Sequence, residues 1–135
     1  REAGIETRAG FLVGLPGETP ELAKKTIQTA IDLDPDYAQF TVCCPYPGTK
    51  LANEIHEGKW GKFLTHELKK YNMWNVTWLP FGYKNAEELK NMERYAFRKF
   101  YLRPSYIIKR IMKIRRFEDI KRYIKGGAAL VRGFL

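Results

Sequence analysis

The residues best suited to chemistry in this chain are the glycines and prolines of two turns. The first turn closes the stretch Gly10-Phe-Leu-Val-Gly-Leu-Pro-Gly-Glu-Thr19, and the second is Pro45-Tyr-Pro-Gly-Thr49. Each turn follows an apolar run that is typical of a buried strand, and each leads into a helical pattern. Turns at the carboxyl ends of such strands bring bare backbone close to a ligand, because α/β proteins bind ligands at this edge. The two turns therefore predict a ligand site.

The first strand carries glycine at alternate positions. Gly10, Leu12 and Gly14 are expected on one face, and Phe11 and Val13 on the other. Two glycines of three on one face leave space for a flat group against the strand, where a protein-filled barrel interior would carry larger side chains. The alternative is that these glycines allow a helix to pack closely against the strand.

The side chains that could bind a metal are few. Cys43 and Cys44 are the two cysteines of the sequence, and they are adjacent. Neighbouring Cα atoms lie about 3.8 Å apart, whereas a disulfide needs roughly 4.4–6.8 Å, so we expect reduced thiols in a cytoplasmic protein. Packing is the simpler role for them, and a nucleophile or metal pair is the alternative. His56 and His66 are too few and are expected to lie too far apart for a metal site, so each is interpreted as a surface or packing residue and the sequence predicts no metal ligand.

The elements that position the two turns are expected to form βα units. Residues 5–15 and 37–44 are expected to be strands, and helices are expected from the N-cap Thr19 to residue 33 and over residues 48–57. Apolar strands joined by helices indicate a parallel sheet that is covered on both faces. The predicted fold class is α/β: the C-terminal βα units of a partial, TIM-like (β/α) barrel over residues 1–58, followed by a mainly helical extension.

Residues 59–84 form an irregular, aromatic-rich connection in this prediction. Its rings either fix a long loop to the core or belong to a lid over a substrate. A helix then begins at the N-cap Asn85, with Glu88 completing an arrangement like a capping box, and it ends before Pro104. The aromatic residues of the connection are Trp60, Phe63, Tyr71, Trp74, Trp78, Phe81 and Tyr83.

The positive charge is concentrated in the C-terminal extension, residues 85–135. Residues 1–89 carry 10 Lys and Arg against 12 Asp and Glu, whereas residues 90–135 carry 14 against 3. Two helices are expected here, over residues 105–115 and 117–134. The first places Ile107, Ile108, Ile111, Met112 and Ile114 on one side and Lys109, Arg110, Lys113 and Arg116 largely opposite.

Three interpretations of this basic region remain open. It is a solvated helix that packs on the barrel, an interfacial helix of residues 105–134 on an anionic membrane, or a nucleic-acid-binding segment. No recognised nucleic-acid module is present, so we expect no nucleic-acid partner. The expected localisation is cytoplasmic, with peripheral contact to the inner face of the membrane under the second interpretation.

The two turns, together with Asp36-Tyr-Ala-Gln-Phe40 between them, resemble the fifth and sixth βα units of radical S-adenosylmethionine enzymes. The chain is most similar to the branch with a cobalamin-binding domain, which contains anaerobic magnesium-protoporphyrin cyclase and hopanoid or antibiotic methylases. The run Tyr95-Ala-Phe-Arg-Lys-Phe-Tyr-Leu-Arg-Pro104 resembles the C-terminal region of that branch. The resemblance covers residues 1–60 and 85–104.

The resemblance implies a set of cofactor contacts. Leu12, flanked by Gly10 and Gly14, would pack on the adenine of S-adenosylmethionine, and the backbone of Cys44-Pro45-Tyr46 would meet the adenine edge. The family pattern often places a glutamate three residues after its second glycine. That place is Gly17 here, so the resemblance assigns no role to Glu18.

The resemblance also implies cofactors whose binding residues are incomplete in this sequence. The family holds a [4Fe–4S] cluster on a C-x-x-x-C-x-x-C motif, which this sequence lacks. We therefore expect a C-terminal fragment whose cluster ligands lie upstream of Arg1 and which alone neither holds a cluster nor cleaves S-adenosylmethionine. Cobalamin is an optional further cofactor, and the expected substrate is a small or lipid-like molecule.

The sequence names no catalytic residue. Two other functions compete with the radical enzyme: a non-catalytic basic amphipathic module that binds a membrane or a partner, and an ordinary (β/α) barrel that takes a phosphate-bearing substrate.

Overall fold

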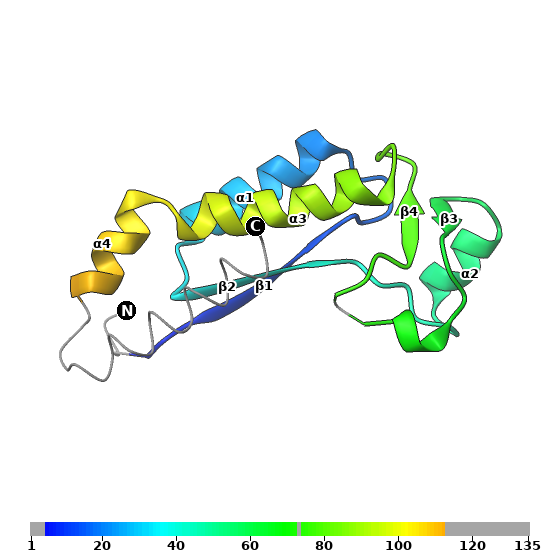
Figure 1. The fold of residues 1–135 in the computed structure, drawn as a ribbon, viewed down its shortest axis with the longest axis horizontal. Helices are drawn as coiled ribbons and strands as arrows, with labels where there is room; N and C mark the ends of the chain where they lie inside the picture. The colour runs from blue at the N-terminus through cyan, green and yellow to red at the C-terminus, as the bar shows by residue number, and fades with distance from the viewer. Residues whose placement is uncertain (1–4, 73, 113–135) are drawn as a thin grey trace.

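The computed structural model describes residues 5–72 and 74–112, which form a parallel pair of strands with helices and a small hairpin region at its end (Figure 1). The elements in chain order are β1 (Arg8–Val13), α1 (Pro20–Leu33), β2 (Tyr37–Val42), α2 (Lys50–His56), β3 (Gly61–Phe63), η1 (Leu68–Lys70), β4 (Trp78–Pro80), α3 (Ala86–Tyr101) and α4 (Pro104–Met112).

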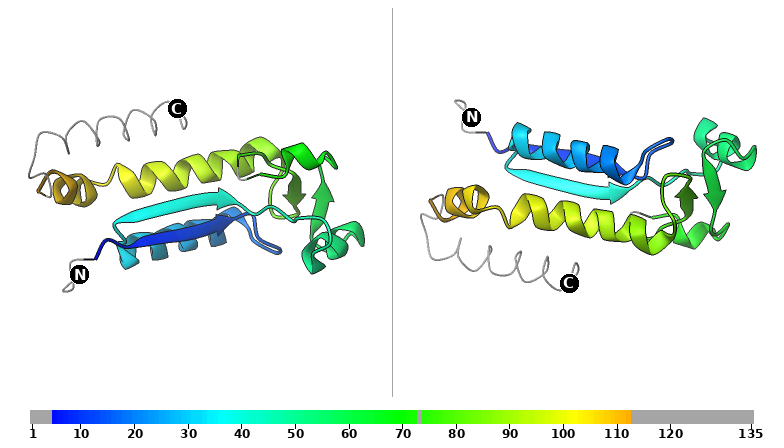
Figure 2. Two further views of the ribbon diagram at one scale, coloured as in Figure 1. Left: turned by 90° about the horizontal axis from the view of Figure 1, so that it is seen from below. Right: turned by 90° about the horizontal axis from the view of Figure 1, so that it is seen from above.

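Strands β1 and β2 are parallel and in register from Arg8 opposite Tyr37 to Val13 opposite Val42. Helix α1 is the crossover between them, as the sequence predicted. Both strands point toward α2 and the hairpin of β3 and β4, whereas α4 lies at the opposite end (Figures 1 and 2). The two sequence-predicted turns therefore lie at the hairpin end of the molecule.

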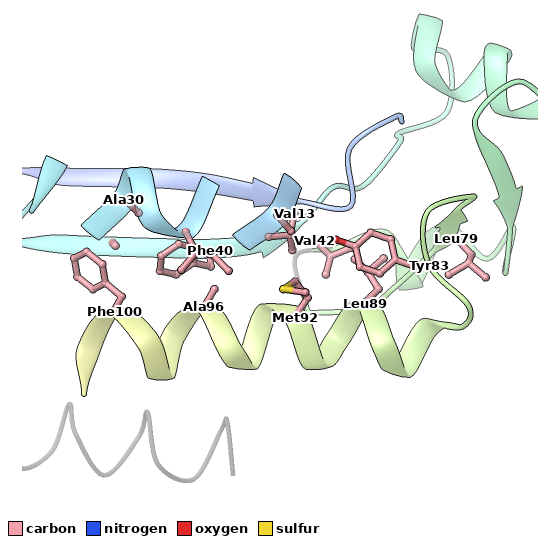
Figure 3. Packing of buried hydrophobic residues seen from close by; sticks show 13 residues of the cluster. Val13, Ala30, Phe40, Val42, Leu79, Tyr83, Leu89, Met92, Ala96 and Phe100 are labelled. Atoms are coloured by element: carbon pink, nitrogen blue, oxygen red, sulfur yellow. The ribbon is translucent and has the colours of Figure 1, made fainter. Parts of the chain in front are cut away.

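The core lies between one face of this sheet and two helices. Helices α1 and α3 contact each other, and both contact the strands. Phe40 and Val42 of β2 face Ala96 and Phe100 of α3 in the interior (Figure 3). Phe40 packs edge-on against Phe100, with 6.0 Å between the ring centroids. Burial of these side chains removes apolar surface from water and fixes the helices to the sheet.

The other face of the sheet is open, which differs from the prediction of a sheet covered on both faces. Gly10 and Leu12 of β1 and Gln39 of β2 are exposed on this face. Within the described residues no element packs over Gly10, Leu12 or Gln39, and no barrel closes. The described part is an α/β layer with one covered face and one open face.

Local capping signals predicted the starts of α1 and α3 correctly. The Thr19 hydroxyl accepts a hydrogen bond from the Leu22 N–H at 3.4 Å and begins α1. Asn85 accepts from the Glu88 N–H at 2.8 Å, while the Glu88 carboxylate accepts from the Lys84 N–H at 2.6 Å. This second bond comes from the residue before the cap, but it closes the reciprocal arrangement that the sequence predicted.

The prediction of an irregular connection over residues 59–84 was wrong in part, because β3 and β4 pair as an antiparallel hairpin. The strands have three residues each, too few to show an alternating pattern in the sequence. The aromatic residues divide between the core and the surface. Trp78 is fully buried, whereas Trp74 and Phe81 are 67% and 70% exposed.

The basic region is described only as far as Met112. Helix α4 confirms the first predicted helix up to that residue and begins at Pro104. The predicted helix over residues 117–134 lies outside the described residues. Among the helices of residues 5–72 and 74–112, none has the length and apolar character that a membrane span requires.

Candidate functional site

The open face of the sheet carries the first predicted contact residues. A side-chain carbon placed at Gly10 would meet no atom within 4 Å, and Leu12 is 45% exposed. The register places Gln39 beside Gly10 and Thr41 beside Leu12 on β2. The face thus combines a glycine gap, an exposed aliphatic side chain and two neighbouring polar residues. A flat ring fits against such a surface, and an amide and a hydroxyl border it.

Gly14 differs from Gly10 in its surroundings. It lies in the turn after β1 with a φ of +73°, a conformation that favours glycine. A side-chain carbon here would lie 2.8 Å from Cδ1 of Leu89 on α3. Close helix packing, the alternative reading of the glycines, therefore describes Gly14, whereas the open space is at Gly10.

A buried carboxylate, Glu18, holds the first turn. The side chain reaches back so that its Oε1 atom accepts a hydrogen bond from the Gly14 N–H at 2.6 Å and from the Tyr83 hydroxyl at 2.7 Å. Glu18 is 6% exposed and Tyr83 is 4% exposed. Charge-assisted hydrogen bonds of this kind are among the stronger ones, so they fix the backbone where β1 ends.

Sequence reasoning missed both members of this pair. The resemblance assigns no role to Glu18, and Tyr83 is one of several aromatic residues of the predicted connection. A turn glycine followed closely by an acid was a signal for the bond to Gly14. Nothing local to Tyr83 indicated that it meets Glu18.

The segment that carries Tyr83 also lies tightly against the turn. A side-chain carbon at Gly82 would lie 1.9 Å from the backbone oxygen of Glu18, so only glycine fits there. The Phe81 N–H donates to the carbonyl of Trp60 at 3.0 Å and joins this segment to the start of the hairpin. The predicted connection is therefore part of the framework of the site.

The end of β2 is held by the same segment. The Cys43 N–H donates to the Val13 carbonyl at 2.8 Å and extends the parallel pairing. The Cys43 carbonyl accepts from the Trp78 indole N–H at 2.8 Å, and the Cys44 sulfur lies 3.6 Å from the Thr77 hydroxyl oxygen. Thr77, Trp78 and Tyr83 thus contact the residues that follow both strands; we call residues 77–83 the brace.

The two cysteines have different environments. Cys43 is buried, and desolvation raises the pKa of its thiol to about 11, with smaller contributions from Cys44 and Glu18. Cys44 is partly exposed. Both are free thiols, as expected from their adjacency. Cys43 is consequently protonated at neutral pH and is a poor nucleophile or metal ligand.

The remaining predicted contacts, Pro45 and Tyr46, lie in the second turn. Pro45 is fully buried, whereas Tyr46 is 51% exposed, with its ring centroid 6.2 Å from that of Tyr71. The Tyr46 carbonyl accepts from the Thr49 hydroxyl at 2.7 Å, and the Thr49 hydroxyl accepts from the Ala52 N–H at 3.2 Å to begin α2. These bonds hold the turn at the start of α2, and the Tyr46 ring is exposed.

The histidines do not supply a metal centre. The prediction that they are too far apart was wrong, since the His56 and His66 rings stack with centroids 5.7 Å apart. Both pack on Phe63, which agrees with the packing role. Across residues 5–72 and 74–112 no three His, Cys, Asp or Glu side chains gather to hold a metal ion. The two cysteines of the sequence do not fit a cluster that needs three thiolates.

Comparison with known proteins relates the chain to enzymes. No protein-family model matches it. It is 36% identical over 131 residues to an uncharacterised methyltransferase of Pyrococcus horikoshii, covering 93% of this chain and 27% of that protein. It is 32% identical over 103 residues to the anaerobic magnesium-protoporphyrin IX monomethyl ester cyclase of Cereibacter sphaeroides, covering 76% of this chain and 16% of that enzyme.

A second cyclase of the same name, from Rubrivivax gelatinosus, is 28% identical over 107 residues, covering 79% of this chain and 18% of that enzyme. The chain therefore spans about a quarter of the length of the methyltransferase and less than a fifth of the cyclases. These similarities support, at a coarse level, the resemblance that the turn motifs indicated.

Proposed function

We propose that residues 1–58 are the closing βα units of a radical S-adenosylmethionine barrel and that the open face of β1 and β2 holds the adenine of this cofactor. The observation that carries the proposal is the empty space at Gly10 beside the half-exposed Leu12. A purine is a flat, mainly apolar ring with a polar edge, and this surface offers the corresponding groups.

In this proposal each part of the chain has a distinct task. Leu12 supplies the apolar floor under the ring, and the backbone of residues 44–46 meets its edge. The brace and Glu18 keep the two turns at a fixed spacing, so that the surface is formed before the cofactor binds. When bound, S-adenosylmethionine supplies a 5′-deoxyadenosyl radical to this family of enzymes.

The same face also forms one wall of the substrate cavity in this proposal. Tyr37 and Gln39 of β2 continue the surface beyond Gly10, and Arg8 lies with its guanidinium carbon 5.8 Å from the Tyr37 ring centroid. Aromatic, amide and cationic groups suit a small or lipid-like molecule with a polar end. The relatives lead us to propose methyl transfer or cyclisation as the reaction of a longer protein that contains this chain.

No step of the proposal uses a metal bound to these residues. A cluster of the family type needs three thiolates, so its ligands would belong to another part of the longer protein, and cobalamin stays an optional cofactor there. The contribution of this chain is to bind and orient the nucleoside and to close one side of the cavity.

The test is an NMR titration of the chain with S-adenosylhomocysteine, a stable analogue of the cofactor. We expect the largest amide shifts at residues 10–14 and 44–46. Gly10→Val fills the gap without a clash in the free chain and is expected to weaken the response at least tenfold. Ser105→Val is the control, because Ser105 is an exposed residue of α4 at the opposite end.

The titration separates the competing functions. Shifts confined to other residues, or an equal response from Gly10→Val, would contradict the adenine site. Shifts of the same turn amides with inorganic phosphate, and none with the nucleoside, would favour a barrel that takes a phosphate-bearing substrate.

A further inference from the structure

Helix α4 packs on the rest of the chain through its basic side. Arg110 is only 9% exposed, and its guanidinium carbon lies 4.2 Å from the centroid of the Tyr37 ring. Its Nε donates to the Tyr106 hydroxyl at 3.0 Å, and its terminal nitrogen donates to the Asp36 carbonyl. Stacking on tyrosine and hydrogen bonds to a tyrosine hydroxyl and a backbone carbonyl replace the water that the guanidinium loses.

A second contact fixes the same side of the helix. The Asp34 carboxylate, at the end of α1, forms ion pairs with both Arg103 and Lys109. Arg103 also donates to the Ile31 carbonyl at 2.9 Å. Arg103, just before α4, and Lys109 within it thus bind groups at the end of α1, which orients the helix about its axis.

This orientation turns the apolar side of α4 outward. The exposed fractions are 42% for Ile107, 55% for Ile108, 61% for Ile111 and 75% for Met112. Residues one and four positions apart are neighbours on a helix surface, so these four side chains form a continuous stripe. Single exposed aliphatic residues are common, but a contiguous stripe indicates a contact surface. We call these four residues the outer stripe.

The charge around the outer stripe indicates which kind of partner it fits. Arg98 and Lys99 at the end of α3 are exposed, Lys109 of α4 is half-exposed, and residues 94–112 contain no Asp or Glu. In a symmetric dimer the same cationic surface would face itself, which like-charge repulsion opposes. Anionic lipid complements both features, because apolar side chains enter the interfacial region while cations meet the headgroups.

We propose that the outer stripe of α4 docks the chain on an anionic membrane surface. The two turns are not involved, since α4 lies at the end away from the turns (Figure 1). The proposal is independent of the adenine site, and it assigns to α4 the membrane contact that residues 105–134 suggested.

The experiment is co-sedimentation of the full chain with phosphatidylcholine vesicles that contain or lack phosphatidylglycerol. The test variant is Ile108→Ser/Ile111→Ser, which removes apolar area from the outer stripe without changing the charge. The matched control is Leu64→Ser/Leu68→Ser. These leucines are 43% and 72% exposed and lie outside α4, in the hairpin region at the far end.

Binding of the wild type and the control to anionic vesicles, with at least a tenfold weaker partition of the α4 variant, would support the proposal. Thermal unfolding checks that all three proteins are folded. Equal binding by the α4 variant would overturn the proposal, because residues outside the stripe would then hold the membrane. Absence of wild-type binding, or a concentration-dependent dimer that the α4 variant abolishes, would also overturn it.

Discussion

The hydroxyl of Tyr83 donates a hydrogen bond of 2.7 Å to the carboxylate of Glu18, across 65 residues of sequence. The same carboxylate oxygen accepts from the Gly14 N–H at 2.6 Å. One buried acid therefore joins the end of the first strand to the brace that also contacts the end of the second. The spacing of the two candidate binding turns depends on this link.

Loss of the Tyr83 hydroxyl should weaken the fold measurably. Tyr83→Phe leaves the ring in the core but removes one hydrogen bond to a buried carboxylate. Hydrogen bonds to charged groups contribute about 1.5–3 kcal/mol, and we expect a decrease in the free energy of unfolding within that range. Urea denaturation measures it, with Tyr95→Phe on the 40% exposed Tyr95 as the control. Equal stability of the two variants would contradict the link.

Two glycine substitutions separate backbone strain from packing. Gly48→Ala places a side chain at a φ of +83° with no atom within 4 Å, so it should cost about 1–2 kcal/mol of unfolding free energy. Gly14→Ala has a similar φ but also displaces Leu89, and we expect a larger loss. Urea denaturation measures both losses of unfolding free energy, and equal losses would contradict this prediction.

The two thiols should differ strongly in alkylation. Burial raises the pKa of Cys43 to about 11, so near pH 8 its thiolate fraction is roughly a hundredfold below that of a thiol with a pKa of 9.0. Iodoacetamide should therefore modify Cys44 first and Cys43 only after unfolding. Peptide mass spectrometry over time measures this, and Cys44→Ser provides the matched single-thiol protein. Rapid labelling of native Cys44→Ser would contradict the burial of Cys43.

The pH dependence of stability should contain a contribution from Glu93. Desolvation raises the pKa of this carboxyl above 4.5, although Lys90 opposes the shift. The folded chain then binds the proton more tightly than the unfolded chain, so this contribution falls as pH rises from 4.5 through the raised pKa. Glu93→Gln should remove the decrease. Unfolding curves at several pH values measure it, and parallel profiles for the two proteins would refute it.

Local sequence signals predicted those parts of the site whose conformation depends on residues close together in the chain. The two turns, the parallel βα units and the caps at Thr19 and Asn85 follow from glycine, proline and side-chain oxygens acting within a few residues. The open position at Gly10 was also deduced from strand alternation. The hairpin was not, because strands of three residues have no distinct period.

The sequence by itself determined the elements, their order and the turns where backbone is available for binding, since these depend on interactions between residues close in the chain. The tertiary structure decided which groups meet: Glu18 with Tyr83, Trp78 with the carbonyl of Cys43, and Arg110 with Tyr37. It also turned the apolar side of α4 outward. Helical periodicity separates the two sides of a helix, but only the carboxylate and carbonyls at the end of α1 select the side that packs inward.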